Sequence, residues 1–117
     1  AAETVHAVVG TKDDDALALP PGPDGRVDLA ALLQALQDRS VVSVLLEGGP
    51  VLAAAFLRAG LVDRVVGYVA PALLGAGVAA VGDVGVGTIA AALRLRLSEV
   101  ERVGGDVRLT ARPERSE

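Results

Sequence analysis

Hydrophobic periodicity in the first third of the chain predicts a strand, a loop and a helix. Residues 4–11 are rich in β-branched side chains and run into a charged patch, a pattern typical of a strand that ends in a loop. Residues 20–25, PPGPDG, carry strong turn signals. After Asp28, a good N-cap residue, leucines recur at the spacing of one helix face. We therefore expect an amphipathic helix that ends near Arg39.

The middle of the chain predicts a strand, a tight turn, a second helix and another strand. Residues 41–46, VVSVLL, are a nearly continuous apolar run, which fits a strand covered on both faces in a parallel α/β sheet. Pro50 suits the first position of a helix over residues 51–59, and Gly60 suits its left-handed C-terminal cap. Residues 63–70 predict the next strand.

The last third of the chain predicts a loop, a short helix and a β-hairpin. Pro71 ends the preceding strand, and a glycine-rich loop continues to about Gly87. Residues 88–93 predict a short helix. Apolar and charged residues then alternate over 93–103 and 107–112, on either side of a Gly-Gly-Asp turn, and this pattern predicts an antiparallel hairpin.

The order of these elements defines the expected fold class. An order of βαβαβ followed by ββ describes an α/β domain, with a mixed sheet flanked by helices that ends in an antiparallel β-hairpin at or near an edge. A chain of 117 residues fits one domain with one core. We place that domain at residues 1–112 and expect residues 113–117 to be a frayed tail. Because only 2% of the residues are aromatic, Ala, Val and Leu must build the core.

Composition argues against two classes of partner. A net charge of −4 and a single lysine do not suit a nucleic-acid surface, since phosphate binding needs clustered Lys and Arg. The uncharged run over residues 65–82 is interrupted by Pro71 and several glycines, so we do not expect it to span a membrane. No export signal is visible at the N-terminus. We expect a cytoplasmic protein.

Metal ligands and nucleophiles are scarce in this sequence. There is no cysteine, and His6, which we place on a strand face, is the single histidine, so a thiolate or multi-histidine metal site cannot form within the chain. The adjacent Asp13, Asp14 and Asp15 lack the glycine turn and later glutamate of a calcium loop, and predict a solvated turn. We expect no bound metal and no Ser-His-Asp or Cys-His catalytic set.

The turn between the apolar strand and the second helix is the strongest candidate for chemistry. Because Gly48 and Gly49 have no Cβ, a ligand can approach the backbone closely. The free N–H groups of the first helical turn carry a partial positive charge, which suits a pyrophosphate or a ribose phosphate. The alternative is that the two glycines only make a tight strand-to-helix turn.

Two neighbouring features also bear on ligand binding. Glu47 follows the apolar strand, where its carboxylate could either cap the helix or accept hydrogen bonds from hydroxyl or amino groups of a ligand at the mouth of the sheet. Residues 85–90, GVGTIA, imitate a dinucleotide fingerprint, but no strand of suitable length precedes them. We interpret them as part of a loop.

Three stretches together resemble a known family. Residues 44–75, VLLEGGPVLAAAFLRAGLVDRVVGYVAPALLG, are similar to the C-terminal signature of bacterial riboflavin-biosynthesis reductases. Residues 25–36 and the hairpin sequence at 100–109, VERVGGDVRL, resemble the same family in the same order. The chain departs from the family at Arg64, where an acidic residue is usual, and in length, since the family's reductase domain is nearly twice as long.

The resemblance implies a fold, an activity and a set of site residues. The fold would be dihydrofolate-reductase-like, and the enzyme would use NADPH to reduce 5-amino-6-(5-phosphoribosylamino)uracil to its ribitylamino form without a metal. Glu47 would contact the substrate, and no catalytic residue is assigned. The implied cofactor-binding residues are Gly48, Gly49, Pro50, Val51, Leu52, Ala53, Ala54 and Ala55. A homo-oligomer, specifically a homodimer, is expected, and in many relatives a deaminase domain precedes the reductase.

Two other functions remain open at this point. One is a different NADPH-dependent reductase of the same fold that acts on a pteridine or another pyrimidine, because the EGG turn would bind the shared cofactor. The other is a non-catalytic module for oligomerisation or cofactor binding.

Overall fold

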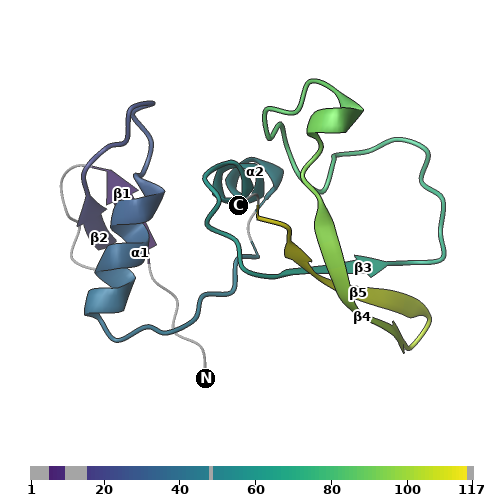
Figure 1. The fold of residues 1–117 in the computed structure, drawn as a ribbon. Coiled ribbons are helices and arrows are strands. Elements are labelled where there is room, and N and C mark those ends of the chain that lie inside the picture. The colour runs from purple at the N-terminus through teal and green to yellow at the C-terminus, as the bar shows by residue number, and fades with distance from the viewer. Residues whose placement is uncertain (1–5, 10–15, 48, 116–117) are drawn as a thin grey trace. The chain divides into compact units, whose positions relative to one another are not determined.

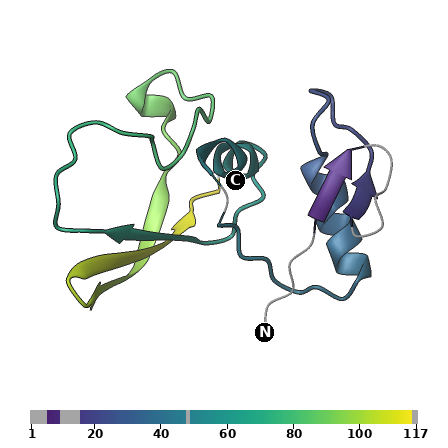
Figure 2. The ribbon, with the colours of Figure 1, turned by 180° about the vertical axis from the view of Figure 1, so that it is seen from behind.

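The computed structural model describes residues 6–9, 16–47 and 49–115, and the chain divides into two compact units. The first unit comprises residues 1–45 and the second comprises residues 46–117. Figures 1 and 2 show the helices and strands of each unit from two sides.

The first unit consists of two short strands and one helix. Strand β1 (His6–Val9) pairs in parallel with β2 (Ala16–Leu19), and helix α1 spans Leu29–Asp38. Leu19 of β2 and Leu36 of α1 are buried. Strand β1 falls within the predicted strand at 4–11, whereas β2 was not predicted from the sequence.

Helix α1 begins where the sequence predicts, because Asp28 is its N-cap. The Asp28 carboxylate accepts a hydrogen bond from the Ala31 N–H at 3.1 Å. At the other end, Ser40 has a positive φ of 64°, a left-handed conformation that ends the helix. The predicted boundary near Arg39 is confirmed, since Arg39 is the C-cap.

The second unit contains helix α2 and a three-stranded antiparallel sheet. Helix α2 spans Pro50–Arg58, and Gly60 follows with a φ of 70°, as predicted for its C-terminal cap. The strands are β3 (Val65–Val69), β4 (Leu95–Val103) and β5 (Asp106–Pro113), in the order β3-β5-β4. A single 3-10 turn, η1 (Ile89–Ala91), precedes β4. Ala54 and Phe56 of α2 and Ala111 of β5 are the buried residues of this unit.

The predicted hairpin is confirmed, and it forms through a two-residue turn. Val103 pairs with Asp106, so Gly104 and Gly105 lie between the two strands. Gly104 has a φ of 60°, whereas Gly105 does not have a positive φ. A positive φ at the first central position only is the pattern of a type II′ turn, which takes glycine there and matches the natural twist of paired strands.

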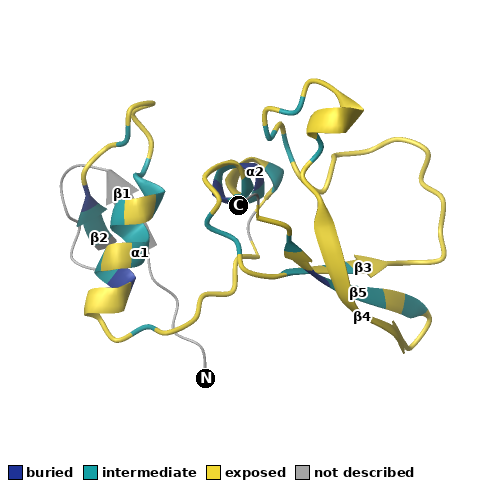
Figure 3. Ribbon diagram, viewed as in Figure 1, coloured by how far each residue is buried: buried dark blue, intermediate teal, exposed yellow. Residues whose placement is uncertain are grey.

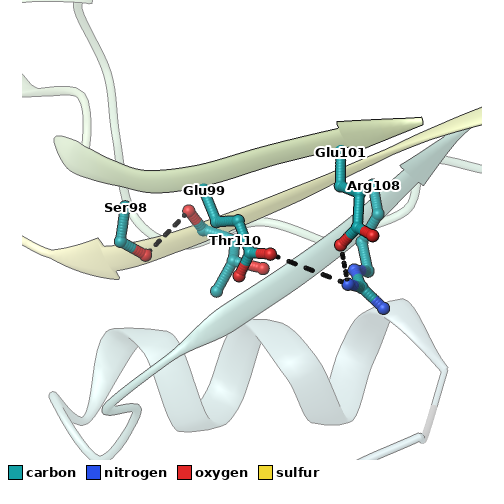
Figure 4. Close-up of polar contacts among 5 residues, drawn as sticks. All are labelled: Ser98, Glu99, Glu101, Arg108 and Thr110. Atoms are coloured by element: carbon teal, nitrogen blue, oxygen red, sulfur yellow. Dashed lines mark hydrogen bonds and ion pairs between the residues drawn. The ribbon is translucent and has the colours of Figure 1, made fainter. Parts of the chain in front are cut away.

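A β-bulge in β4 keeps the two faces of the sheet chemically distinct. The register between β4 and β5 shifts between Leu97 and Glu99, so that Ser98 is the extra residue. Because of this shift, Leu97 and Val100 lie on the same face of the sheet, a face that Glu99 would otherwise occupy. The Ser98 hydroxyl donates a hydrogen bond to the Thr110 carbonyl at 3.1 Å, which gives that carbonyl a partner at the bulge (Figure 4).

The opposite face of the sheet is polar and is organised around Arg108. Tyr68, Arg108 and Glu101 are cross-strand neighbours on β3, β5 and β4. Arg108 forms an ion pair with Glu101 and lies 3.9 Å from the Glu99 carboxylate (Figure 4). A side-chain hydrogen bond with Tyr68, followed by the negative charge of Glu101, raises the pKa of the Arg108 guanidinium above its ordinary value. This face is therefore held by a cross-strand polar ladder.

The predicted buried strand at residues 41–46 is wrong. These residues belong to no strand, and Val42 and Leu45 are 98% and 80% exposed. A strand needs a hydrogen-bonded neighbour, and within the described part of the chain β3 pairs only with β5 while β1 pairs only with β2. An apolar sequence without such a neighbour does not become a strand.

The expected fold class is confirmed in part. The chain is a small α/β structure with two helices and the predicted antiparallel hairpin. The parallel pairing and the antiparallel pairing, however, occur in two separate sheets and not in one mixed sheet. At the C-terminal end, β5 extends to Pro113 and the Glu114 N–H donates to the Arg94 carbonyl at 2.8 Å, while the division of the chain at residue 112 stays a prediction.

Candidate functional site

The N-terminus of α2 is the part of the predicted site that the structure describes best. Gly49 is the N-cap, Pro50 is the first helical residue, and the start of the helix has no side-chain cap. The Ala53 N–H donates to the Gly49 carbonyl at 3.1 Å. The amides of Val51 and Leu52 precede this bond, in the turn where helix N–H groups have no partner within the helix.

Exposure divides the predicted cofactor-binding residues into two groups. Val51 and Leu52 are 60% and 41% exposed, so the first turn of the helix lies at the surface of its unit. Ala54, by contrast, is only 2% exposed and contributes to the core. Ala53 and Ala55 are half-buried. The first turn is therefore exposed, and the more buried residues after it anchor the helix.

Gly49 does not need to be glycine for the turn to form. Its φ of −71° and ψ of 177° are extended backbone that any residue adopts, and a Cβ added there would meet no atom within 4 Å. Ser, Thr, Asp and Asn are the usual N-cap residues because their side chains satisfy a free helix N–H. A side chain at this position would therefore be accommodated without a clash. Gly48 lies outside the described residues.

Glu47 is exposed, and its carboxylate does not cap α2. In the described part of the chain it accepts no hydrogen bond from the helix. The structure therefore does not support the interpretation in which the Glu47 carboxylate caps helix α2. Glu47 precedes the N-cap Gly49 by two positions in the sequence, close to Val51 and Leu52, whose amides have no partner within the helix.

The loop between β3 and η1 returns to the first turn of α2. The Gly82 N–H donates a hydrogen bond to the Pro50 carbonyl at 2.9 Å. Directly after it, the Asp83 carboxylate accepts a hydrogen bond from the Gly85 N–H at 2.7 Å, and Gly85 has a φ of 81°. Much of this loop is otherwise exposed (Figure 3). The contact at Gly82 was not predicted, because the sequence marks Gly82 only as one of several loop glycines.

The interpretation of residues 85–90 as a loop is confirmed for 85–88, whereas 89 and 90 begin η1. Residues 70–88 contain no strand, so no strand leads into GVGTIA as a dinucleotide fingerprint requires. Thr88 instead caps η1, since its hydroxyl accepts a hydrogen bond from the Ala91 N–H at 3.3 Å.

The described residues give little support to other kinds of site. Among them, no group of three His, Cys, Asp or Glu side chains is placed to hold a metal ion, although Asp13, Asp14 and Asp15 lie outside the described residues. His6 lies on β1, as expected. In the same part of the chain, no helix has the length and apolar character needed to cross a membrane.

Sequence comparison matches nearly the whole chain to one family. The family described as RibD C-terminal domain matches residues 2–109. Two Mycobacterium tuberculosis strains have a protein named riboflavin biosynthesis protein RibD that is 57% identical over 79 residues, which are 68% of this chain and 23% of that protein. The Escherichia coli protein of the same name is 38% identical over 90 residues, 76% of this chain and 24% of that protein.

Comparison with solved structures agrees with the sequence match. Acinetobacter baumannii RibD superposes with a TM-score of 0.69 and 34% identity, over 86% of this chain and 27% of that chain. A pyrimidine reductase-like protein from Corynebacterium diphtheriae superposes with a TM-score of 0.64 at 22% identity, over 87% of this chain and 40% of that chain, which is a likeness of fold. The chain spans about a quarter of the length of the curated relatives it matches.

Proposed function

The chain belongs to the RibD C-terminal domain family, and on that premise we propose that it acts in riboflavin biosynthesis as an NADPH-dependent reductase of 5-amino-6-(5-phosphoribosylamino)uracil. In this proposal the chain supplies one wall of the active site, with the first turn of α2 holding the phosphates of NADPH and Glu47 contacting the substrate. The family membership supports the pathway, and the geometry around α2 supports the assignment of roles.

The observation that carries the proposal is the open start of α2. The exposed first turn offers backbone N–H donors and the positive end of the helix dipole, and both favour a phosphate. Among the residues that the structure describes, no side chain caps these donors. Gly49 leaves the approach free although its backbone conformation would accept any residue. The donors therefore fit the pyrophosphate of a dinucleotide.

The residues of this chain act by binding and orientation. When bound, NADPH supplies the hydride that reduces C1′ of the open-chain sugar, where the carbon–nitrogen double bond becomes a single bond and the nitrogen takes a proton. Amides at the first turn of α2 would fix the cofactor through its phosphates, and the exposed Glu47 carboxylate would accept hydrogen bonds from substrate hydroxyl or amino groups. We assign no proton donor in this chain.

The relatives suggest further partners. Since the chain spans about a quarter of their length, the remaining contacts of the active site would come from parts of the reductase outside this sequence. A deaminase domain joined to the reductase and a homodimer belong to the same proposal.

Two substitutions on either side of the turn test the division of roles. Glu47→Gln removes the acceptor charge but keeps the size. In a reductase that contains this chain and the remaining contacts of the active site, we expect it to lower kcat/KM for the pyrimidine about ten-fold, while the Kd for NADPH changes less than about two-fold. Gly49→Val fills the approach to the amides, and we expect it to raise the Kd for NADPH about ten-fold. NADPH fluorescence measures binding, and absorbance measures NADPH oxidation. The reverse pattern, with Glu47→Gln weakening NADPH first, would contradict the assigned roles.

A further inference from the structure

We propose that Gly82 is a positioning residue for the cofactor phosphates, which it controls through the peptide group between Pro50 and Val51. This inference rests on the proposed function, because it concerns how the donors at the first turn of α2 are held. Gly82 lies far from α2 in the sequence, and the pattern of residues at the turn before α2 gives no sign of it.

Gly82 makes a hydrogen bond to the first turn of α2. Its N–H donates to the Pro50 carbonyl at 2.9 Å, and that carbonyl belongs to the same planar peptide group as the Val51 N–H. Because the peptide group is planar, fixing its oxygen also fixes the direction of its N–H. A hydrogen bond to the oxygen also polarises the N–H at the other end of the group. Gly82 is therefore an additional donor to a carbonyl of the helix, and it helps to orient and polarise the Val51 donor.

Gly82 also lies so close to the helix that a side chain there would make a tight contact. A Cβ at this position would lie 3.1 Å from the Pro50 carbonyl oxygen and 3.6 Å from the Ala54 Cβ. The oxygen belongs to the backbone of the helix, and Ala54 is only 2% exposed, so neither neighbour is the free end of a flexible side chain. An added methyl group would therefore shift the first turn of α2 or push the loop away from it.

The backbone conformation of Gly82 does not itself require glycine. Gly82 does not have a positive φ, so its conformation is open to other residues, unlike that of Gly85 with a φ of 81°. The close approach to Pro50 is thus what favours glycine at this position. Gly87, in the same loop, also lacks a positive φ, but a Cβ added there would meet no atom within 4 Å, which makes Gly87 a matched control.

The test compares Gly82→Ala, Gly82→Val and the control Gly87→Ala in the 117-residue chain. Titration with NADPH, followed by fluorescence, should show a Kd raised about five-fold for Gly82→Ala and further for Gly82→Val, with Gly87→Ala within about two-fold of the unsubstituted chain. Without any ligand, the amide resonance of Val51 should shift in both Gly82 variants and not in Gly87→Ala. Hydrogen exchange in α2 should stay unchanged in Gly82→Ala, because a positioning role does not require the helix to unfold.

The outcomes separate the inference from the function on which it rests. If the unsubstituted chain binds NADPH and both Gly82 variants bind it equally well, the inference is overturned and the proposed function stands. Weaker binding that only follows a loss of α2 protection would assign Gly82 a structural role and would also overturn the inference. If the unsubstituted chain does not bind NADPH at all, the proposed function fails, and the inference fails with it.

Discussion

The two helices of this chain begin in opposite ways. At α1, the Asp28 carboxylate accepts a hydrogen bond from the Ala31 N–H, so the helix satisfies one of its own free donors. At α2, the N-cap is Gly49 and the helix start has no side-chain cap. A capping side chain contributes about 1 kcal/mol to helix stability, and α2 is folded without that contribution.

The difference indicates which helix can serve a ligand. The start of α1 is capped by a side chain of the protein, whereas the start of α2 has no side-chain cap, and within the described residues the Gly82 N–H donates to its Pro50 carbonyl. Both helices were predicted from the same kinds of sequence signal, yet only one has an open N-terminus. The missing side-chain cap at the exposed start of α2 is therefore the feature that favours phosphate binding at this helix.

The largest expected effect comes from removing the side chain that anchors α2. Phe56 is 6% exposed, and Phe56→Ala should reduce the free energy of opening of α2 by about 3 kcal/mol, because burial is lost and a cavity remains. Hydrogen exchange of the α2 amides measures this opening. Leu73→Ala, at a fully exposed loop position, is the control and should change it by less than about 0.5 kcal/mol. Equal effects of the two substitutions would mean that Phe56 does not anchor the helix.

A smaller effect is expected from giving α2 the kind of cap that α1 has. Gly49→Asp should stabilise α2 by about 0.3 kcal/mol relative to the unsubstituted chain. It should also bind NADPH at least about ten-fold more weakly than Gly49→Asn does. Asn has nearly the same size and also caps, so the contrast isolates the negative charge facing the phosphates. NADPH fluorescence and hydrogen exchange measure the two effects. Equal affinity of the Asp and Asn variants would place the phosphates elsewhere.

The smallest expected effect on NADPH binding comes from a substitution at α1. Asp28→Ala should destabilise α1 by about 1 kcal/mol through the loss of its cap, while the Kd for NADPH stays unchanged. Hydrogen exchange of the α1 amides gives the first quantity, and Asp28→Asn, which can still cap, should restore most of the loss. A weakened Kd for NADPH in Asp28→Ala would show that the closed helix also takes part in binding.

Sequence reasoning succeeded where the signals are local. Asp28, Pro50 and Gly60 mark helix ends through interactions within one turn, and Gly104 specifies a hairpin whose two strands are adjacent in the sequence. Such features depend on a few neighbouring residues, so the sequence determines them without knowledge of the rest of the fold.

Sequence reasoning failed where a strand depends on a distant neighbour. The apolar run at 41–46 carries a stronger β pattern than residues 16–19, yet the latter form β2 because β1 is there to pair with them. The same limit applies to the candidate site. The turn after Glu47 could be recognised from its glycines, but the contact between Gly82 and Pro50 joins residues too far apart for any spacing rule to find.

The donors at the start of α2 can be observed directly while the cofactor binds. Amide resonances of Val51, Leu52 and Ala31 should be followed by NMR while NADPH is added to the 117-residue chain. We predict saturable shifts of Val51 and Leu52 at the open start of α2, and none of Ala31 at the capped start of α1. Shifts of equal size at both helices, or saturable binding that leaves Val51 and Leu52 unmoved, would contradict the claim that the first turn of α2 holds the cofactor phosphates.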